Sequence, residues 1–284
     1  MSIQSEIKYQ TPKQPRQLRI DSTSFCNAGC LSCHRFLSKR KGEMPVEMIE
    51  TILEDVSHWD MPLKEIVPVN YGEFFLRKDW YLILNKIAHL LPHTNIVIPT
   101  NGSRFTLDTV LKLSEIPNIK VINFSVNAYF DETYEAFMKL PASTIVEIRK
   151  AVAQLKVMRP DITLWVSMCF DPMYQSDLEK DLFVYYWTGH AIPQIIPAAS
   201  AGRKEKKLII QHKIPCRSIF SDMVIGYDGK ISSCCWDASF SMDLGWLKKS
   251  VFAAWHSPEM DELRKLHLKG RRNEIELCSQ CTYA

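Results

Sequence analysis

The sequence predicts an α/β protein built as a partial (β/α)6 TIM-like barrel, followed by a small C-terminal domain made of a β-hairpin and a helix. Short runs of β-branched and other apolar residues alternate with segments in which apolar residues recur every three or four positions. This alternation is typical of a parallel sheet with outer helices, and right-handed crossovers curl such a sheet into a full or partial barrel. From about residue 208 the alternation stops.

The barrel elements follow one another along the chain as β-like and helix-like segments. The expected strands span residues 18–23, 66–71, 95–100, 121–126, 162–170 and 194–198. The expected helices span residues 46–59, 79–91, 106–115, 144–158 and 177–188. Asp108, Asp131 and Asp177 are expected to cap helices or to lie in their first turns. In barrels of this kind the chemistry takes place at the carboxyl ends of the strands.

The C-terminal part begins with the segment IGYDGKISSCC, which predicts a hairpin with Asp228 and Gly229 in its turn. A helix is expected over 257–268, ending at Gly270. We therefore expect three parts: a polar leader (1–16), the barrel (17–205) and a small domain (206–284). The small domain lacks an obvious apolar core, which a metal cluster would supply.

Composition limits the class of protein. The 284 residues are 46% hydrophobic, enough for a large core, and 35 basic against 32 acidic residues give a net charge of only +3. Nothing in this balance calls for a nucleic-acid partner. No apolar run approaches the roughly 20 residues of a membrane span, and the N-terminus lacks the apolar middle of a signal peptide. We expect a cytoplasmic protein with no membrane partner.

Nine cysteines are many for a chain of this size without export signals. Thiols in the cytosol stay reduced, so clustered cysteines indicate metal binding rather than disulfides. Cys169 and Cys235 stand apart from the two groups that the other seven form. These groups are Cys26, Cys30 and Cys33, and then Cys216, Cys234, Cys278 and Cys281.

The first group, Cys26-x3-Cys30-x2-Cys33, follows the first expected strand and therefore lies on a loop at its carboxyl end. Three thiolates at this spacing can hold three corners of a 4Fe-4S cluster and leave the fourth iron open to a ligand. The alternatives are a zinc site, which usually shows paired C-x2-C units, and cysteines that pack in a core.

The residues CNAGCLSC at 26–33 resemble the cluster motif of the radical S-adenosylmethionine (radical SAM) superfamily. The resemblance implies that S-adenosylmethionine chelates the open iron and that an electron from the cluster cleaves its sulfonium. The resulting 5′-deoxyadenosyl radical then abstracts hydrogen from a substrate. The family commonly has an aromatic residue where this chain has Ser32.

Further segments resemble the family's cofactor-binding positions in the expected order. Tyr71-Gly72-Glu73 resembles the Gly-Gly-Glu motif, with Tyr71 at the first glycine, and implies that Gly72 and Glu73 meet the methionine ammonium group. The resemblance extends to positions that contact the methionine carboxylate, the ribose and the adenine, which here are Thr100, Asn101, Ser125, Asn127 and Ile196. Taken singly, such polar residues are also typical of turns and strand ends.

The second group supplies four thiolates, enough to ligate a cluster completely, although a four-cysteine zinc site has similar spacing. Cys216-x12-Gly229-x4-Cys234 with a terminal Cys278-x2-Cys281 resembles the SPASM/twitch extension of radical SAM enzymes, in its short form with one auxiliary 4Fe-4S cluster. The layout is similar to that of an aminocyclitol dehydrogenase of this subfamily. We expect Cys234 rather than Cys235 as the ligand, because adjacent strand residues point to opposite faces.

The leading hypothesis is an oxidoreductase that uses S-adenosylmethionine and two 4Fe-4S clusters to oxidise a small molecule, such as a sugar or cyclitol alcohol, by two electrons. Flavodoxin or ferredoxin is the expected electron donor. The alternatives are radical modification of a peptide or protein side chain, and a non-catalytic iron–sulfur or zinc module. No catalytic acid or base is identified; Cys169 is a weak candidate beside its structural interpretation. His34 and Arg35 are expected in a solvated loop.

Overall fold

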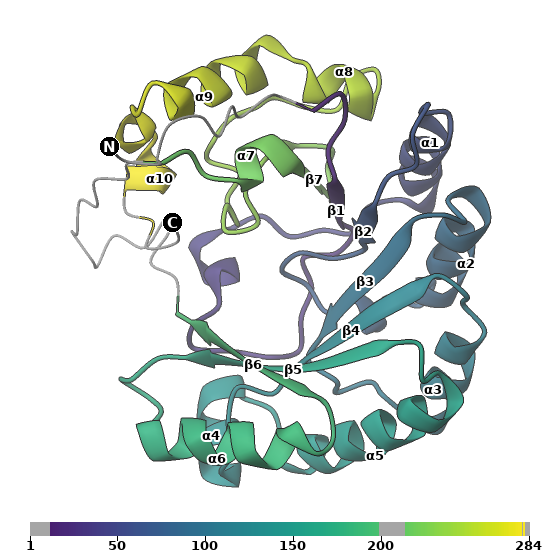
Figure 1. Cartoon of the computed structure of the whole chain (residues 1–284), viewed down its shortest axis with the longest axis vertical. Coiled ribbons are helices and arrows are strands. Elements are labelled where there is room, and N and C mark those ends of the chain that lie inside the picture. The colour runs from purple at the N-terminus through teal and green to yellow at the C-terminus, as the bar shows by residue number, and fades with distance from the viewer. Residues whose placement is uncertain (1–11, 199–213, 280, 282–284) are drawn as a thin grey trace, which may run out of the picture.

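The computed structural model describes residues 12–198, 214–279 and 281, and its centre is one eight-stranded sheet (Figure 1). The strand order is β6-β5-β4-β3-β2-β1-β7-β8, and every neighbouring pair is parallel except β7 and β8. The strands are β1 (Gln17–Asp21), β2 (Glu65–Val67), β3 (Asn95–Thr100), β4 (Ile119–Ser125), β5 (Thr163–Phe170), β6 (Ile192–Pro197), β7 (Asp222–Gly226) and β8 (Ile231–Ser232).

Helices cover the outer side of the curved sheet (Figure 1). The barrel helices are α1 (Val46–Ser57), α2 (Trp80–Leu90), α3 (Leu107–Ser114), α4 (Asp131–Met138), α5 (Ser143–Met158) and α6 (Asp177–Thr188). Short 3-10 turns are η1 (His34–Leu37), η2 (Phe74–Leu76) and η3 (Arg272–Glu274), and the C-terminal helices are α7 (Ser218–Ser221), α8 (Val251–Trp255), α9 (Pro258–Leu268) and α10 (Glu276–Ser279). As expected, Asp108, Asp131 and Asp177 lie in first turns, where a carboxylate faces the positive end of the helix dipole.

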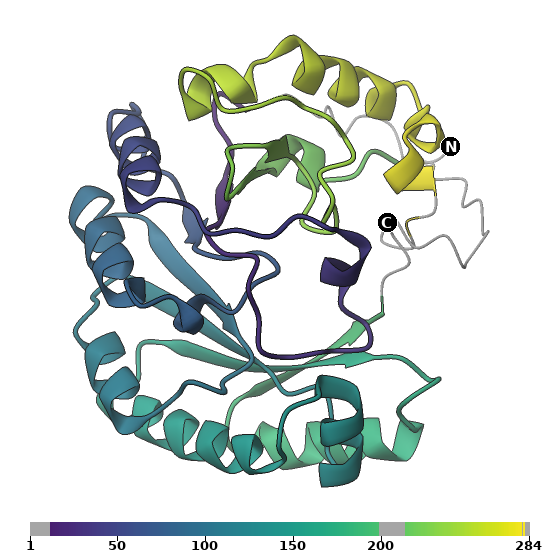
Figure 2. The ribbon, with the colours of Figure 1, turned by 180° about the vertical axis from the view of Figure 1, so that it is seen from behind.

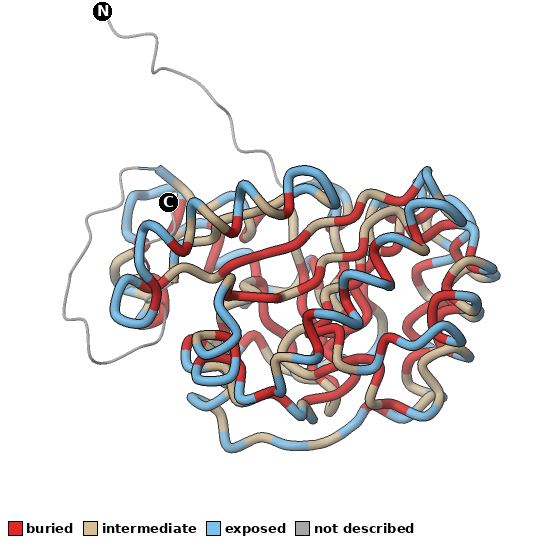
Figure 3. Tube along the Cα trace, turned by 90° about the horizontal axis from the view of Figure 1, so that it is seen from below, coloured by how far each residue is buried: buried red, intermediate tan, exposed pale blue. Residues whose placement is uncertain are grey.

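The sheet is an open barrel. Its edge strands are β6 and β8, and no pairing joins them within the part of the chain that the structure describes. Along β3, buried and partly exposed residues alternate because successive side chains point to opposite faces of the sheet. Figure 3 shows buried residues along the strands and mixed exposure along the outer helices. The predicted α/β partial barrel is confirmed, and none of the described helices is long and apolar enough to cross a membrane.

The second strand is shorter than the predicted 66–71. β2 ends at Val67, because Pro68 has no N–H to donate to a strand ladder. The next backbone donors turn instead to the end of β1, where Asp21 Oδ1 accepts from Asn70 N at 3.0 Å and from Tyr71 N at 3.1 Å. This side-chain contact ties the segment after β2 to the carboxyl end of β1.

The predicted hairpin forms as β7 and β8, with Gly229 in its turn at a φ of +84°. β7 also pairs in parallel with β1, in register from Gln17↔Asp222 to Asp21↔Gly226, which the sequence did not indicate. The apolar residues of β7 therefore join those of the barrel in one continuous core. The expected boundary at 205/206 lies outside the described residues.

Gly72 marks a close approach between two strand ends. A Cβ placed on Gly72 would lie 2.1 Å from the backbone oxygen of Thr23, which follows β1. A Cβ on Gly189, at the end of α6, would meet nothing within 4 Å.

We predict that Gly72→Ala lowers the free energy of unfolding by about 2 kcal/mol or more, because a backbone atom cannot move aside as a side chain can. The matched change Gly189→Ala should be neutral or slightly stabilising. Denaturant unfolding of both variants measures the difference. Equal stabilities would show that the two strand ends are not packed as described.

Candidate active site

The segment that carries the first cysteine group is a closed loop between β1 and α1. Its two ends are joined by hydrogen bonds from Ser24 N to Gly42 O (3.0 Å) and from Met44 N to Ser22 O (2.8 Å). Figure 2 shows this segment crossing the opening of the curved sheet, with η1 toward the C-terminal part. Cys26, Cys30 and Cys33 all lie on the loop and are partly exposed.

Backbone hydrogen bonds fix the loop to the elements beside it. Glu73 N, after β2, donates to Phe25 O at 2.8 Å. Gly29 N and Leu31 N donate to the last turn of α4, at Met138 O (2.9 Å) and Phe137 O (3.0 Å). Main-chain groups are obligatory hydrogen-bonding partners, so these contacts hold the loop in place whatever its side chains.

The thiols of this loop lie close enough to affect one another. Burial, with smaller contributions from the neighbouring Cys33 and Cys26, raises the pKa of Cys30 to about 12. Burial also raises the pKa of Cys26, whose sulfur lies 3.7 Å from Asn101 Nδ2, a donor at the end of β3. Cys30 Sγ lies 3.4 Å from Met138 Sδ. A metal would take these groups as thiolates and release their protons.

Glu73 is buried where β2, β3 and the cysteine loop meet. Its carboxylate accepts hydrogen bonds from Thr100 Oγ1 (2.9 Å), Asn101 N (2.6 Å) and Phe75 N (3.2 Å). Burial raises the pKa of Glu73, and these hydrogen bonds oppose the rise. A carboxylate has about four acceptor positions, so roughly one remains for a ligand after the chain's own donors are counted.

The other expected cofactor residues lie on β4 and β6 or follow these strands. Asn127 adopts a left-handed φ of +63°; its Nδ2 is 3.0 Å from Met138 Sδ, and its Oδ1 accepts from Cys169 N at 2.7 Å. Met138 thus contacts both Asn127 and Cys30. Ser125 ends β4 opposite Ser167, and Ile196 lies on β6 opposite Cys169.

The four cysteines of the second group also gather. Cys281 packs in a small apolar cluster with Leu277, Cys234, Trp236 and Met242. Burial raises the pKa of Cys234, with further rises from Cys235, Cys278 and Cys216. Burial, with smaller contributions from Cys216 and Cys281 and against the opposing Arg272, raises the pKa of Cys278 to about 12. The four sulfurs, together with that of the adjacent Cys235, therefore lie close enough to affect one another's pKa.

His267 connects two of these cysteines, which the sequence did not indicate. Its Nδ1 accepts from Cys216 N at 3.2 Å, so the neutral ring carries its proton on Nε2, which lies 3.8 Å from Cys278 Sγ. Within the described residues, no three His, Cys, Asp or Glu side chains lie as close together as the ligands of a single metal ion. A four-iron cluster is larger than one ion and spaces its thiolates more widely.

The reason predicted for choosing Cys234 rather than Cys235 does not hold. Both residues follow the end of β8, so the alternation of side chains along a strand does not apply to them. The pKa of Cys235 is raised by burial, and Arg19 on β1 opposes this more than any other charge. Cys235 O accepts from Asn70 Nδ2 at 3.2 Å, after β2.

Three rings connect the two cysteine groups. The His34 ring lies 5.0 Å from that of Trp236 and 6.4 Å from that of Tyr71. His34 is only 1% exposed, so the expectation of a solvated position is wrong for this residue. The Tyr71 hydroxyl is buried and makes no hydrogen bond to any residue that the structure describes. The only sequence signals for these contacts were the positions of His34 after Cys33 and of Trp236 after Cys235.

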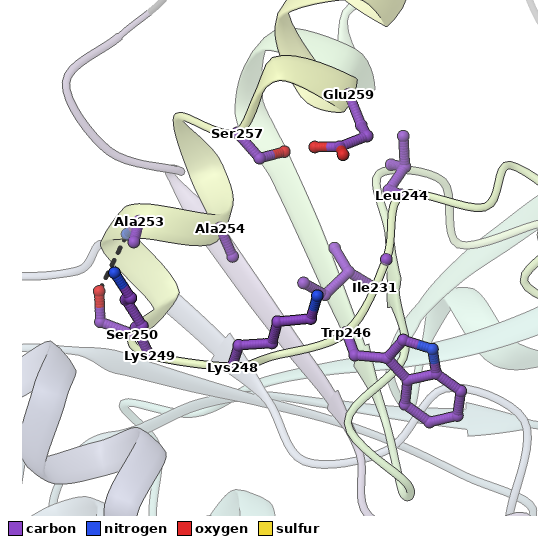
Figure 4. Close-up of a pocket in the computed structure, with 11 residues that line it drawn as sticks. Ile231, Leu244, Trp246, Lys248, Lys249, Ser250, Ala253, Ala254, Ser257 and Glu259 are labelled. Carbon is purple, nitrogen blue, oxygen red and sulfur yellow. Dashed lines mark hydrogen bonds between the residues drawn. The ribbon is translucent and has the colours of Figure 1, made fainter.

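One cavity lies away from the cysteines. It has a volume of about 210 Å³ and is bounded by β8, the segment before α8, and the first turns of α8 and α9. Figure 4 shows Lys248 and Glu259 facing it from opposite sides. None of the seven grouped cysteines lines it.

Comparison with models of protein families shows the family of this chain. The model of the radical SAM superfamily matches residues 20–182, more than half of the chain. The chain belongs to the radical SAM superfamily. The model of an iron–sulfur cluster-binding domain, SPASM, matches residues 216–282 and so contains the second cysteine group. This radical SAM enzyme therefore carries an auxiliary cluster-binding domain behind its barrel.

Solved structures of similar fold come from enzymes with different ligands. BtrN in complex with AdoMet and 2-DOIA is 19% identical, covers 94% of this chain and 92% of its own, and has a TM-score of 0.67. Streptococcus suis SuiB bound to precursor peptide SuiA (15%, 90% and 68%, 0.69) and anSMEcpe with AdoMet and Cp18Cys peptide (14%, 93% and 88%, 0.66) are also similar. At these identities the likeness shows the fold alone. No curated protein sequence matches this chain.

Asp21 is a buried carboxyl at the carboxyl end of β1, 4% exposed. Burial raises its pKa to about 6, although the N–H groups of Tyr71 and Asn70 and the charges of Arg40 and Arg19 oppose the rise. Because the pKa is higher in the folded chain than in the unfolded chain, ionisation of Asp21 above about pH 6 disfavours the fold.

We predict that Asp21→Asn, which keeps an acceptor for both N–H groups, stabilises the fold at pH 8 and not at pH 4. The gain should grow between pH 4 and about 6 and reach on the order of 2 kcal/mol. Denaturant unfolding across this range measures it, with the exposed Asp60→Asn as control. A gain that does not depend on pH would mean that Asp21 is not a buried titrating group.

Proposed function

We propose that Cys26, Cys30 and Cys33 hold a 4Fe-4S cluster whose fourth iron binds S-adenosylmethionine. When bound and reduced there, this cofactor supplies a 5′-deoxyadenosyl radical that abstracts hydrogen from a substrate. The main support for the proposal is that backbone hydrogen bonds attach the three-cysteine loop to Glu73, in the segment after β2, and to the last turn of α4. This attachment brings three mutually coupled thiols to the end of a parallel sheet, where such folds place their chemistry.

The residues around the loop fit the binding of this cofactor. The remaining acceptor position on Glu73 would accept from the methionine ammonium group, while Thr100 Oγ1 and Asn101 N each donate to one of the carboxylate oxygens. Asn101 Nδ2 also donates toward Cys26 Sγ, and hydrogen bonds to cluster thiolates shift the reduction potential. Gly72 allows the close approach to Thr23 that a side chain would prevent. We assign the remaining cofactor contacts to Ser125, Asn127 and Ile196.

We further propose that Cys216, Cys234, Cys278 and Cys281 ligate a second 4Fe-4S cluster completely. The coupling among the four thiols supports this, as does the match of residues 216–282 to an iron–sulfur domain. His267 would keep its proton on the nitrogen that faces Cys278, because its other nitrogen accepts from Cys216 N. The zinc alternative shares this donor set but not the iron–sulfur family match.

The proposed reaction is a two-electron oxidation of a small molecule such as a sugar or cyclitol alcohol. Hydrogen abstraction from the alcohol carbon would leave one electron and the hydroxyl proton to be removed. A fully ligated cluster is a suitable acceptor for the electron, and the proton would pass to water. The chain is similar to BtrN over 92% of the length of BtrN, and BtrN was solved with the small molecule 2-DOIA. This similarity favours the small-molecule substrate class. Similarity to SuiB and anSMEcpe, both solved with peptides, keeps peptide modification as the second candidate. A module without catalysis leaves the radical SAM match over 20–182 without a role.

We predict that anaerobically reconstituted protein carries about eight irons per chain, and that replacing Cys26, Cys30 and Cys33 together by Ala reduces this to about four. The triple variant should form no 5′-deoxyadenosine from S-adenosylmethionine with dithionite, because no open iron remains. Iron analysis and chromatography of the nucleoside products measure both effects. Cofactor cleavage at the parental rate in the triple variant would rule out the assignment of this loop.

For the second site we predict that Cys234→Ser loses the absorbance and all of the iron that the auxiliary cluster contributes, which is about half of the total iron. The matched change Cys235→Ser should keep both, since Cys281 packs in one cluster with Cys234 and not with Cys235. Iron content and visible absorption of the two reconstituted variants provide the comparison. The reverse result would move the ligand to Cys235.

A further inference from the structure

The cysteine loop has an unusual outer surface. Between Asp21 and Glu43 the sequence contains no acidic residue but four basic ones, Arg35, Lys39, Arg40 and Lys41. The loop also exposes large apolar side chains: Phe36 is 59% exposed and Leu37 47%. Two more exposed apolar residues come from the same loop, Phe25 and Leu31. A basic surface with exposed apolar side chains is a typical binding surface for another macromolecule.

The basic residues line one concave surface, which we call the cluster-loop face. A shallow cavity of about 310 Å³ is lined by Ser24, Arg35, Phe36, Ser38, Lys39, Arg40 and Lys41. Arg40 is already paired with Asp228, and Arg35 donates to Ala28 O at 3.0 Å. Lys39 and Lys41 are exposed and form no ion pair within the described part of the chain. These two lysines are therefore available to a partner.

The cluster-loop face lies close to the three cysteines in the sequence, which favours a partner that transfers electrons. Apart from Ser24, it is formed by residues between 35 and 41, which begin two positions after Cys33, and all three cysteines of the loop are partly exposed. Electron transfer requires the donor centre to come close to the acceptor. A partner bound at this face would contact Arg35, which is only two residues from Cys33. Electron-transfer encounters use small interfaces, in which complementary charge sets the rate of association.

We propose that the cluster-loop face is the docking site for a small acidic electron-transfer protein that carries a flavin or an iron–sulfur centre. Phe36 and Leu37 form the apolar contact, and Lys39 and Lys41 steer the acidic partner. One electron would leave the reduced centre of the partner, which would be oxidised, and would be accepted by the 4Fe-4S cluster that Cys26, Cys30 and Cys33 would hold. This inference rests on the proposed function, since it requires an acceptor at that loop.

The test uses the full reconstituted chain and an acidic flavodoxin. The double variant Lys39→Glu and Lys41→Glu reverses the charge of the face. The control, Lys64→Glu and Lys156→Glu, makes the same charge change on exposed lysines before the amino ends of β2 and β5, at the opposite edge of the sheet. Binding of oxidised flavodoxin is measured by titration, and 5′-deoxyadenosine formation is measured with reduced flavodoxin and, separately, with dithionite.

The face variant should bind flavodoxin roughly tenfold more weakly or worse, and its flavodoxin-driven rate should fall by a similar factor. The control variant should bind like the parent, and salt at about 0.5 M should weaken the parental complex to the level of the face variant. Dithionite should drive all three proteins equally. Equal flavodoxin binding by the parent and the face variant, or no complex with the parent, would overturn the docking site. Failure of dithionite to drive the parent would instead count against the proposed function.

Discussion

The structure of this site depends on backbone hydrogen bonds that attach the loop of Cys26, Cys30 and Cys33 to neighbouring strand ends. A loop of this length has many main-chain donors and acceptors. Here Gly29 N and Leu31 N donate to α4, and Phe25 O accepts from Glu73 N in the segment after β2. The parallel sheet brings those partners to one edge, so the fold, rather than the loop itself, positions the thiols. Met138 extends this arrangement, because it contacts both Cys30 and Asn127.

Backbone hydrogen bonds also bring the second cysteine group close to the first. β7 pairs with β1 along its whole length, so the hairpin that precedes Cys234 continues the barrel sheet. Contacts then cross between the groups: Asn70 donates to Cys235 O, and the His34 ring meets that of Trp236. Two cysteine groups that are far apart in sequence therefore lie on either side of the same side chains. One of these is Tyr71, whose hydroxyl has no hydrogen-bond partner among the described residues. This arrangement fits the proposed reaction, in which a substrate would lose hydrogen at one site and an electron to the other.

Local pattern predicted much of this arrangement, because helix and strand periodicity and cysteine spacing are properties of short segments. β3 forms at the predicted residues, and the DG turn forms the expected hairpin. α4 was missed because its first three residues are polar and its buried residues, Tyr134, Phe137 and Met138, all lie in its last five residues, too short a stretch for a clear period. The pairing of β7 with β1 and the position of His267 between Cys216 and Cys278 join residues far apart in sequence. No local pattern records such contacts.

The central claim is that the loop of Cys26, Cys30 and Cys33 leaves one iron open for S-adenosylmethionine. Electron–nuclear double resonance on the reduced, reconstituted protein tests this directly, with S-adenosylmethionine labelled by ¹⁵N at its amino group. The account predicts a hyperfine coupling from the label to the cluster that disappears when the three cysteines are replaced. A reduced cluster that shows no coupling to the bound, labelled cofactor would contradict it.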